Sequence, residues 1–108
     1  MDGKFLGKID FVEYGTVADY PFYMGLILGF KMNGYEVMSG VKYVVNISPD
    51  CRWEDVERQD AIIKNVEFIY DILKDAKINY VSELLNKPVE VTIEKNTFKD
   101  FRILTEVL

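Results

Sequence analysis

The chain has 108 residues, of which 49% are apolar, 14% aromatic and 29% charged. This length and mixture suit one folded domain over residues 1–108. They disfavour an intrinsically disordered protein, because the apolar surface that can be buried offsets the loss of chain entropy. Eighteen acidic and thirteen basic residues give a net charge of -5, the wrong sign for a protein that tracks a phosphate backbone.

Membrane and secreted classes are disfavoured as well. No apolar run reaches the roughly 18 to 20 residues that a transmembrane helix needs, and no secretion-type apolar stretch follows Met1 to Lys4. The single cysteine, Cys51, cannot form an intramolecular disulfide, which fits a reducing compartment. We therefore expect a cytoplasmic protein without a membrane partner.

Alternating apolar residues predict two strands at the start of the chain. Residues 4–14 alternate between apolar and charged side chains, and a turn is expected over residues 15–21. Every even position from 22 to 32 is apolar, which predicts a central strand. Gly25 and Gly29 share its other face and indicate either a close backbone approach or the seat of a ligand, with sheet geometry favoured.

A hairpin is predicted next. Asn33-Gly34 is the dipeptide typical of a type I′ turn, in which both residues have positive φ. The return strand covers residues 35–47, with a bulge or second turn at Ser39-Gly40.

From Trp53 the apolar period changes to that of a long helix. Apolar residues spaced by 4, 3, 4 and 3 predict one buried stripe, formed by Ile62, Val66, Ile69, Leu73 and Ala76. Acidic residues at its start and Lys74 and Lys77 at its end complement the helix dipole. About 23 residues make a rod of roughly 35 Å.

The last third of the chain predicts a short helix and two strands. Asn79 can cap the helix. Its expected inward side chains are Val81, Leu84 and Leu85. Residues 89–94 and 98–108 then alternate as two strands joined by a turn at 95–97.

The predicted fold is α+β: a curved antiparallel sheet of about five strands, in the order β-β-β-α-α-β-β, packed on one long helix. The same order describes a five-stranded OB-like barrel, so closure of the sheet into a barrel is left as an alternative. Burial of the helix stripe against the sheet is the central packing expectation.

The end of the chain resembles small uncharacterised phage and prophage proteins. The matching segments are Lys87 to Glu94, Asn96 to Lys99 and Phe101 to Leu108, with Cys51-Arg52-Trp53, Glu57-Arg58 and Leu73 to Lys77 in the middle. The similarity spans most of the chain, but Tyr35 to Met38 stand where such proteins carry a glycine-rich segment with a tryptophan. The resemblance implies an accessory protein of a mobile element and no particular reaction.

Enzymatic function is disfavoured. The chain has no histidine, which removes the usual general base, the commonest metal ligand and histidine-activated nucleophiles. Cys51 lies near the expected helix start, where the dipole could activate it, but a lone cysteine is more often a packed side chain. We predict no catalytic residue, no cofactor and no metal site.

Two features are candidates for binding. Acidic residues crowd the helix start, namely Asp50, Glu54, Asp55, Glu57 and Asp60. They lack the glycine and ligand spacing of a calcium loop, so dipole compensation is favoured, with imitation of nucleic acid toward a basic groove as the alternative. Tyrosine and tryptophan near the turns could anchor an interface or stack on bases, although aromatic residues in strands usually form core or cross-strand pairs. The candidate binding residues are Tyr14, Tyr20, Tyr23, Tyr35, Trp53, Glu54 and Asp55.

The leading hypothesis is a non-enzymatic phage or mobile-element accessory protein that binds a host protein in the host cytoplasm and is a candidate inhibitor of host defence. One alternative is an OB-like binder of single-stranded nucleic acid that uses stacking in place of charge. Another is a homo-oligomer that binds a small nucleotide.

Overall fold

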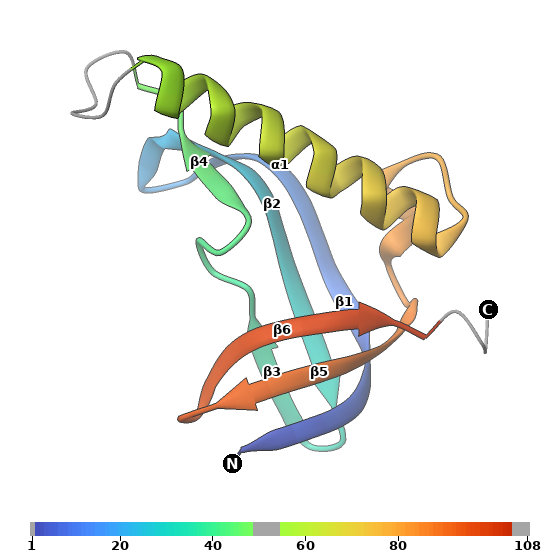
Figure 1. The fold of residues 1–108 in the computed structure, drawn as a ribbon. Coiled ribbons are helices and arrows are strands. Elements are labelled where there is room, and N and C mark those ends of the chain that lie inside the picture. The colour runs from blue at the N-terminus through green and yellow to red at the C-terminus, as the bar shows by residue number, and fades with distance from the viewer. Residues whose placement is uncertain (1, 49–54, 105–108) are drawn as a thin grey trace.

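The structure is a computed structural model that describes residues 2–48 and 55–104. This part of the chain forms six strands, one long α-helix and a short 3-10 helix (Figure 1). The elements are β1 (Gly3–Val17), β2 (Tyr20–Met32), β3 (Tyr35–Met38), β4 (Val44–Asn46), α1 (Asp55–Ala76), η1 (Val81–Leu84), β5 (Pro88–Glu94) and β6 (Thr97–Ile103). The predicted order is confirmed, with the return strand split into β3 and β4.

One antiparallel sheet runs in the order β3-β2-β1-β5-β6, and β4 pairs with β2. The strand β1 belongs to both halves of this sheet, because Gly3 to Lys8 pair with β5 while Gly7 to Val17 pair with β2. Figure 1 shows β1 curving from one half to the other. The predicted α+β class with a curved antiparallel sheet is confirmed.

Ser39 and Gly40 make the break between β3 and β4. The buried Ser39 donates its N–H to the Leu28 carbonyl at 2.8 Å, and its Oγ accepts the Leu28 N–H at 2.9 Å. Gly40 adopts a left-handed φ of 58°, which lets the chain leave the sheet and return as β4. The interruption predicted at this dipeptide is confirmed.

The two glycines of β2 serve close packing. Gly25 pairs with Val44, and a Cβ at Gly25 would overlap the carbonyl oxygen of Tyr43. At Gly29, a Cβ would lie 2.7 Å from the Cβ of Phe11 and 2.9 Å from the sulfur of Met38. Sheet geometry, the interpretation favoured for these glycines, therefore accounts for both.

The sheet is open, because no strand pairing joins β3 to β6 within residues 2–48 and 55–104. Packed aromatic rings connect β2 and β6 with α1. Phe30 stacks on Phe98 with ring centroids 5.0 Å apart, and Tyr43 stacks on Phe68 at 4.4 Å. Phe101 contacts both Phe30 and Tyr43. Side chains rather than backbone hydrogen bonds thus fill the space between the two sides.

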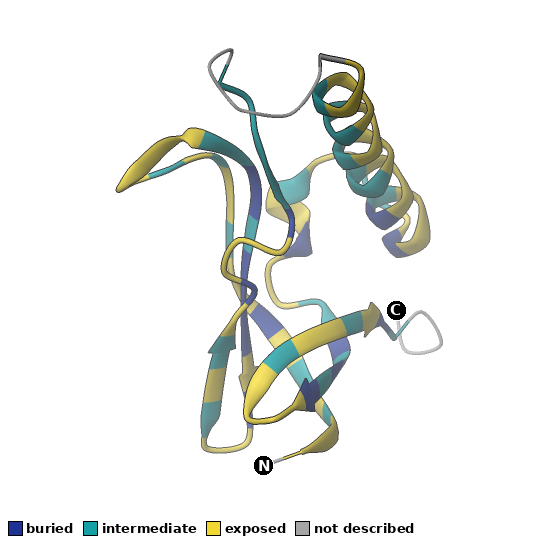
Figure 2. Ribbon diagram, turned by 60° about the vertical axis from the view of Figure 1, so that its left-hand side comes forward, coloured by how far each residue is buried: buried dark blue, intermediate teal, exposed yellow. Residues whose placement is uncertain are grey.

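The core lies mainly under β2 and β5, and few α1 residues join it (Figure 2). Its largest fully buried side chains are Phe30, Ile9, Leu26, Leu28, Leu84, Ile93, Val89 and Val91. On α1, Ile72 and Ala76 are buried, whereas Val66 is 57% exposed. The predicted stripe is therefore wrong at Val66, because the inward face of the helix also uses Asn65 and Phe68.

Polar side chains attach α1 to the segment around β4. The Arg58 guanidinium donates to the Ile47 carbonyl at 2.8 Å, and the Asn65 amide donates to the Tyr43 carbonyl at 2.8 Å. These inward polar positions explain why an apolar stripe alone misplaces the buried face.

The short helix η1 begins one residue later than predicted. Tyr80, not Asn79, is its N-cap residue, and the Glu83 carboxylate accepts the N–H groups of Asn79 and Tyr80, each at 2.9 Å. These hydrogen bonds lower the pKa of Glu83. Leu84 is fully buried as expected, but Leu85 is 47% exposed, so its predicted inward position is wrong.

The left-handed two-residue turn lies at Lys95-Asn96 and not at Asn33-Gly34. Of the latter pair, only Gly34 has a positive φ, 71°, so the predicted type I′ turn is wrong there. Lys95 and Asn96 have φ values of 52° and 61° and join β5 to β6 in the type I′ pattern.

Replacing Lys95 by Asn and Asn96 by Gly is expected to raise the free energy of unfolding by about 1 kcal/mol. Asn and Gly adopt positive φ with less strain than Lys and Asn. Urea unfolding followed by circular dichroism measures the change, and Gly34→Ala, which places a Cβ at positive φ, should shift stability the opposite way. A loss of stability in the double variant would contradict the turn assignment.

Candidate functional site

The candidate binding residues do not form one surface. Tyr20 and Tyr23 lie together at the end of the β1–β2 hairpin, Tyr14 lies on the inward face of β1 beside Leu26, and Tyr35 starts β3 at the opposite end of β2. Asp55 is the first residue of α1. Trp53, Glu54 and also Cys51 and Asp50 lie outside the described residues.

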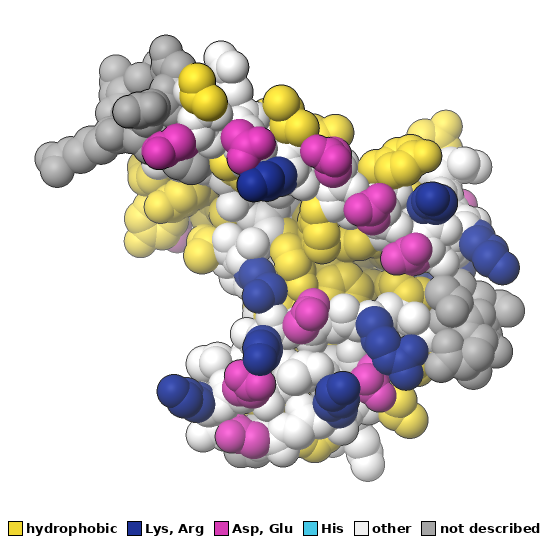
Figure 3. Space-filling model, viewed as in Figure 1, with side chains coloured by type: hydrophobic (Ala, Val, Ile, Leu, Met, Phe, Trp, Pro, Cys, Tyr) yellow, Lys and Arg dark blue, Asp and Glu magenta, His cyan; other side chains and the backbone are white. Residues whose placement is uncertain are grey.

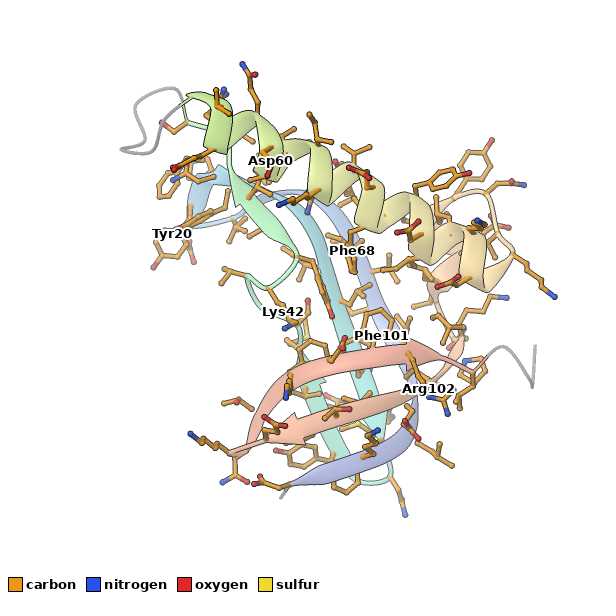
Figure 4. The ribbon with its side chains drawn as sticks, viewed as in Figure 1. Tyr20, Lys42, Asp60, Phe68, Phe101 and Arg102 are labelled. Atoms are coloured by element: carbon orange, nitrogen blue, oxygen red, sulfur yellow. The ribbon has the colours of Figure 1, made fainter. Side chains whose placement is uncertain are left out.

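Three aromatic side chains pack against one another at the hairpin end, and we call them the tip cluster: Tyr20, Phe22 and Tyr23. Ring centroids are 6.1 Å apart for Tyr20 and Phe22, 6.4 Å for Tyr20 and Tyr23, and 4.8 Å for Phe22 and Tyr23. Tyr20 is 53% exposed and Phe22 is 41% exposed. The cluster therefore presents aromatic surface to solvent while its members hold one another in place. Tyr20 is labelled at this end of the molecule in Figure 4.

A bulge in β2 brings these rings together. Thr16 pairs with Met24 and Val17 pairs with Tyr20, so three residues of β2 between those pairs have no counterpart on β1. Adjacent strand residues normally point to opposite faces, but a bulge re-aims them, and this explains the contact between Phe22 and Tyr23. The turn itself contains only Ala18 and Asp19, which is shorter than the predicted turn over residues 15–21.

A shallow apolar groove runs between α1 and β1. It has a volume of about 210 Å³ and is lined by Tyr14, Val66, Ile69 and Val81. Tyr14 is 45% exposed although it lies on the face of β1 that covers the core. The groove exists because α1 contacts the segment around β4 and leaves β1 partly uncovered on this side.

A second recess lies between β4 and α1, with a volume of about 340 Å³. Lys42, Lys64 and Asn65 line it together with the stacked pair Tyr43 and Phe68. Lys64 forms an ion pair with Asp60 at 2.9 Å, which raises the pKa of Lys64. Since Asp60 neutralises one of the two cations and Asn65 already donates to the Tyr43 carbonyl, the recess is poorly equipped to hold an anion. Figure 4 shows Lys42 and Phe68 at this recess, and Figure 3 shows apolar side chains between α1 and β6.

The buried hydroxyl of Tyr43 is the one strongly perturbed group among the described residues. Within the described residues this hydroxyl has no hydrogen-bond partner. Its pKa is raised, mainly by burial and further by the nearby Asp100 carboxylate. A phenol held protonated in this way is a weak nucleophile and a weak base at neutral pH. The ring instead serves packing, since it contacts Phe68, Phe98 and Phe101.

Acidic side chains lie along the exposed face of α1 (Figure 3), but they do not gather into a metal site. Among residues 2–48 and 55–104, no three His, Cys, Asp or Glu side chains are placed to hold a metal ion. In the same residues, no helix is long and apolar enough to cross a membrane.

No family model, no curated protein and no solved structure matches this chain.

Sequence reasoning missed two features of these surfaces. The alternating pattern placed Phe22 in the central strand but did not reveal the bulge at the hairpin end, where Phe22 is exposed. Val66 was assigned to the core, although it lines the groove and is more than half exposed. Pro21, which cannot donate to a strand ladder, is the sequence signal that could have placed the bulge.

Proposed function

We propose that this protein is a non-enzymatic accessory protein of a phage or related mobile element, which binds a host protein through the tip cluster. The observation that carries the proposal is the exposed packing of Tyr20, Phe22 and Tyr23 at the end of the hairpin. Tyrosine contributes large contact area with few rotatable bonds and is enriched among the residues that dominate binding energy. Rings that already pack together lose little freedom when a partner covers them.

Charge indicates the chemistry of that partner. The start of α1 carries Asp55, Glu57 and Asp60 with Arg58 among them, and Figure 1 shows it above the end of the β1–β2 hairpin. The whole chain has a net charge of -5. A partner with a basic rim around an apolar pocket would be attracted by this charge. The aromatic rings of the tip cluster would fill the pocket. The proposed setting is the host cytoplasm, and inhibition of host defence is the consequence we propose for such binding.

The double variant Tyr20→Ser with Phe22→Ser tests this function. The wild-type protein, immobilised and incubated with host lysate at moderate salt, is expected to retain one host protein in stoichiometric amount. The double variant is expected to retain at least about tenfold less, because loss of central aromatic anchors costs the most binding energy. Tyr80→Ser is the matched control, since Tyr80 is 71% exposed and lies away from the tip.

Two results would contradict the proposal. Wild-type protein that recovers no stoichiometric partner would remove the binding function. Equal retention by the wild type and the double variant, with unchanged circular dichroism spectra, would place the interface elsewhere on the molecule.

A second candidate function is supported by the order of the strands. We propose that the sheet is related to an OB-like barrel and stays open between β3 and β6, with aromatic side chains of β2 and β6 packed against each other. Two features support this classification. The strand order is β3-β2-β1-β5-β6, with β1 paired to both halves. When β3 and β4 are counted as one interrupted strand, α1 lies between the third and fourth of five strands, as in an OB fold. Such barrels often bind single strands by stacking, and fluorescence anisotropy with a short labelled oligonucleotide at low salt tests it. Absence of binding at low salt would eliminate this candidate.

A further inference from the structure

The strand β1 has an edge that no other strand covers. On one side it pairs with β2 along most of its length, but on the other side it pairs with β5 only from Gly3 to Lys8. Ile9 makes the last backbone contacts on that second side, where it donates to the Lys87 carbonyl at 3.1 Å and accepts the Asn86 N–H at 2.7 Å. We call residues 11–17 on this side the free edge, because no strand pairs with them there within the described part of the chain. Figure 1 shows this part of β1 at the border of the sheet, below α1.

The register shows which backbone groups face the free edge. The Leu26 N–H donates to the Tyr43 carbonyl at 3.1 Å, so Leu26 directs its backbone groups away from β1. Both members of a directly opposed pair in an antiparallel ladder do so together, and Tyr14 is opposite Leu26. Tyr14, and with it Val12 and Thr16 two residues away on either side, therefore directs its N–H and C=O groups to the free edge. Among residues 2–48 and 55–104 these groups have no hydrogen-bond partner, so they can pair with another extended chain.

Hollows lie on both faces of the sheet beside the free edge. On the face toward α1 is the apolar groove of about 210 Å³ that Tyr14, Val66 and Ile69 line. On the opposite face is a recess of about 340 Å³, whose lining includes Phe11 and Glu13. Tyr14 lines both hollows, as expected of a residue at the border of a sheet. An added strand would point alternate side chains to the two faces and would thus supply both hollows.

Charge indicates the chemistry of such a strand. From Ile9 to Phe30 the chain contains Asp10, Glu13 and Asp19 and no lysine or arginine. The side chains that α1 contributes to the groove are apolar. The surroundings of the free edge are therefore apolar toward α1 and acidic on the opposite face. An extended peptide with alternating apolar and basic side chains is complementary to both.

The other sheet edges are less suited to this peptide. The strand β3 has only four residues. On β6, the Asp100 carboxylate accepts the N–H of Phe101 at 2.8 Å, so a side chain of the strand itself occupies that donor. The exposed residues Lys99 and Arg102 also place positive charge on β6, which would repel a basic peptide. The free edge of β1 is the best match among the described strands.

We propose that β1 binds an extended peptide of a partner protein by strand addition at the free edge. Apolar side chains of the peptide enter the groove between α1 and β1, and its basic side chains lie on the opposite face near Glu13. The peptide backbone pairs with the outward groups of Val12, Tyr14 and Thr16. This inference goes beyond the proposed function, because the backbone of β1 makes the contact and the rings of the tip cluster do not.

Fluorescence anisotropy tests the proposal with three labelled peptides of equal length. The first alternates valine and lysine, and the second alternates valine and glutamate. The third repeats the first with N-methyl groups on the valines, whose N–H groups would face β1 because directly opposed residues share a face. The first peptide is expected to bind at least about tenfold more tightly than the others. The second places like charge beside Glu13, and the third cannot donate to the free edge.

Two variants test the two faces. Glu13→Lys is expected to weaken binding of the valine–lysine peptide at least about fivefold, because attraction becomes repulsion. Glu36→Lys is its matched control: it makes the same change of charge at an exposed residue of β3 and should leave binding almost unchanged. Val66→Lys, at a position that is 57% exposed, should weaken binding at least about tenfold by placing a charge in the groove. The double variant Tyr20→Ser with Phe22→Ser should bind the peptide like the wild type, which separates this test from that of the tip cluster. Circular dichroism checks that each variant is folded.

Amide hydrogen exchange measured by NMR locates the bound peptide. The peptide is expected to slow exchange at Val12, Tyr14 and Thr16. Absence of binding at low salt, equal binding of the N-methylated peptide, equal loss in Glu13→Lys and Glu36→Lys, or slowed exchange confined to β3 or β6 would each overturn the proposal. A wild-type dimer that protects the same amides without peptide would also overturn it, because a second copy would then cover the free edge.

Discussion

Phe30→Ala is expected to lower the free energy of unfolding by about 3–5 kcal/mol, the cost of removing a large aromatic side chain from a packed core. Phe30 is fully buried on β2 and packs against Phe98 and Phe101 of β6 at 5.0 Å. No strand pairing within the described residues joins β3 to β6, so side-chain contacts such as these connect the two sides. The variant loses both the buried apolar area of the Phe30 ring and its contacts with Phe98 and Phe101. Urea unfolding followed by circular dichroism measures the effect.

The control for this prediction is Phe22→Ala on the same strand. Phe22 is 41% exposed in the tip cluster and makes no contribution to the buried core. Its replacement should cost less than about 1 kcal/mol. Equal destabilisation by the two variants would show that the contact between β2 and β6 does not hold the sheet together.

Gly25→Ala is expected to cost about 3 kcal/mol or more. The added methyl group would overlap the Tyr43 carbonyl oxygen and would lie 2.7 Å from the Cα of Val44. Both obstacles are backbone atoms, so relief requires β4 to move away from β2 and lose its pairing. Thermal unfolding monitored by circular dichroism should show a clearly lower melting temperature.

Gly15→Ala is the matched control for that change. Gly15 pairs directly with Gly25 across the β1–β2 ladder, but a Cβ at Gly15 meets nothing within 4 Å. Its replacement should change stability by no more than about 0.5 kcal/mol in either direction. Similar losses at both positions would mean that general strand flexibility, and not the close approach of β4, makes glycine necessary.

Much of the fold could be predicted from the periodicity of the chain. Even positions from Phe22 to Met32 gave the core strand, and the change of period near Trp53 located α1 to within a few residues. The break at Ser39-Gly40 was also predictable, because serine and glycine together interrupt a strand for local reasons. These features depend on neighbouring residues, which is why they can be read from the sequence.

The missed features depend on contacts between distant residues. The wide apolar arc of α1 contains two faces, and only the position of Tyr43 decides that Phe68 and Asn65 face inward while Val66 does not. The type I′ geometry at Lys95-Asn96 follows from the tight pairing of β5 with β6, against the local preferences of lysine. The tip cluster follows from a bulge in the ladder, which alternating residues do not reveal.

The position of β1 between the two halves also determines when this chain can fold. Gly3 to Lys8 find their partners in residues 88–93, so more than two thirds of the sequence must be synthesised between one strand and its neighbour. Contacts of such long sequence separation slow folding, because the loop must close before any pairing is gained. The N-terminal strand therefore leaves the ribosome with one unpaired edge, and it keeps that edge until the last hairpin emerges.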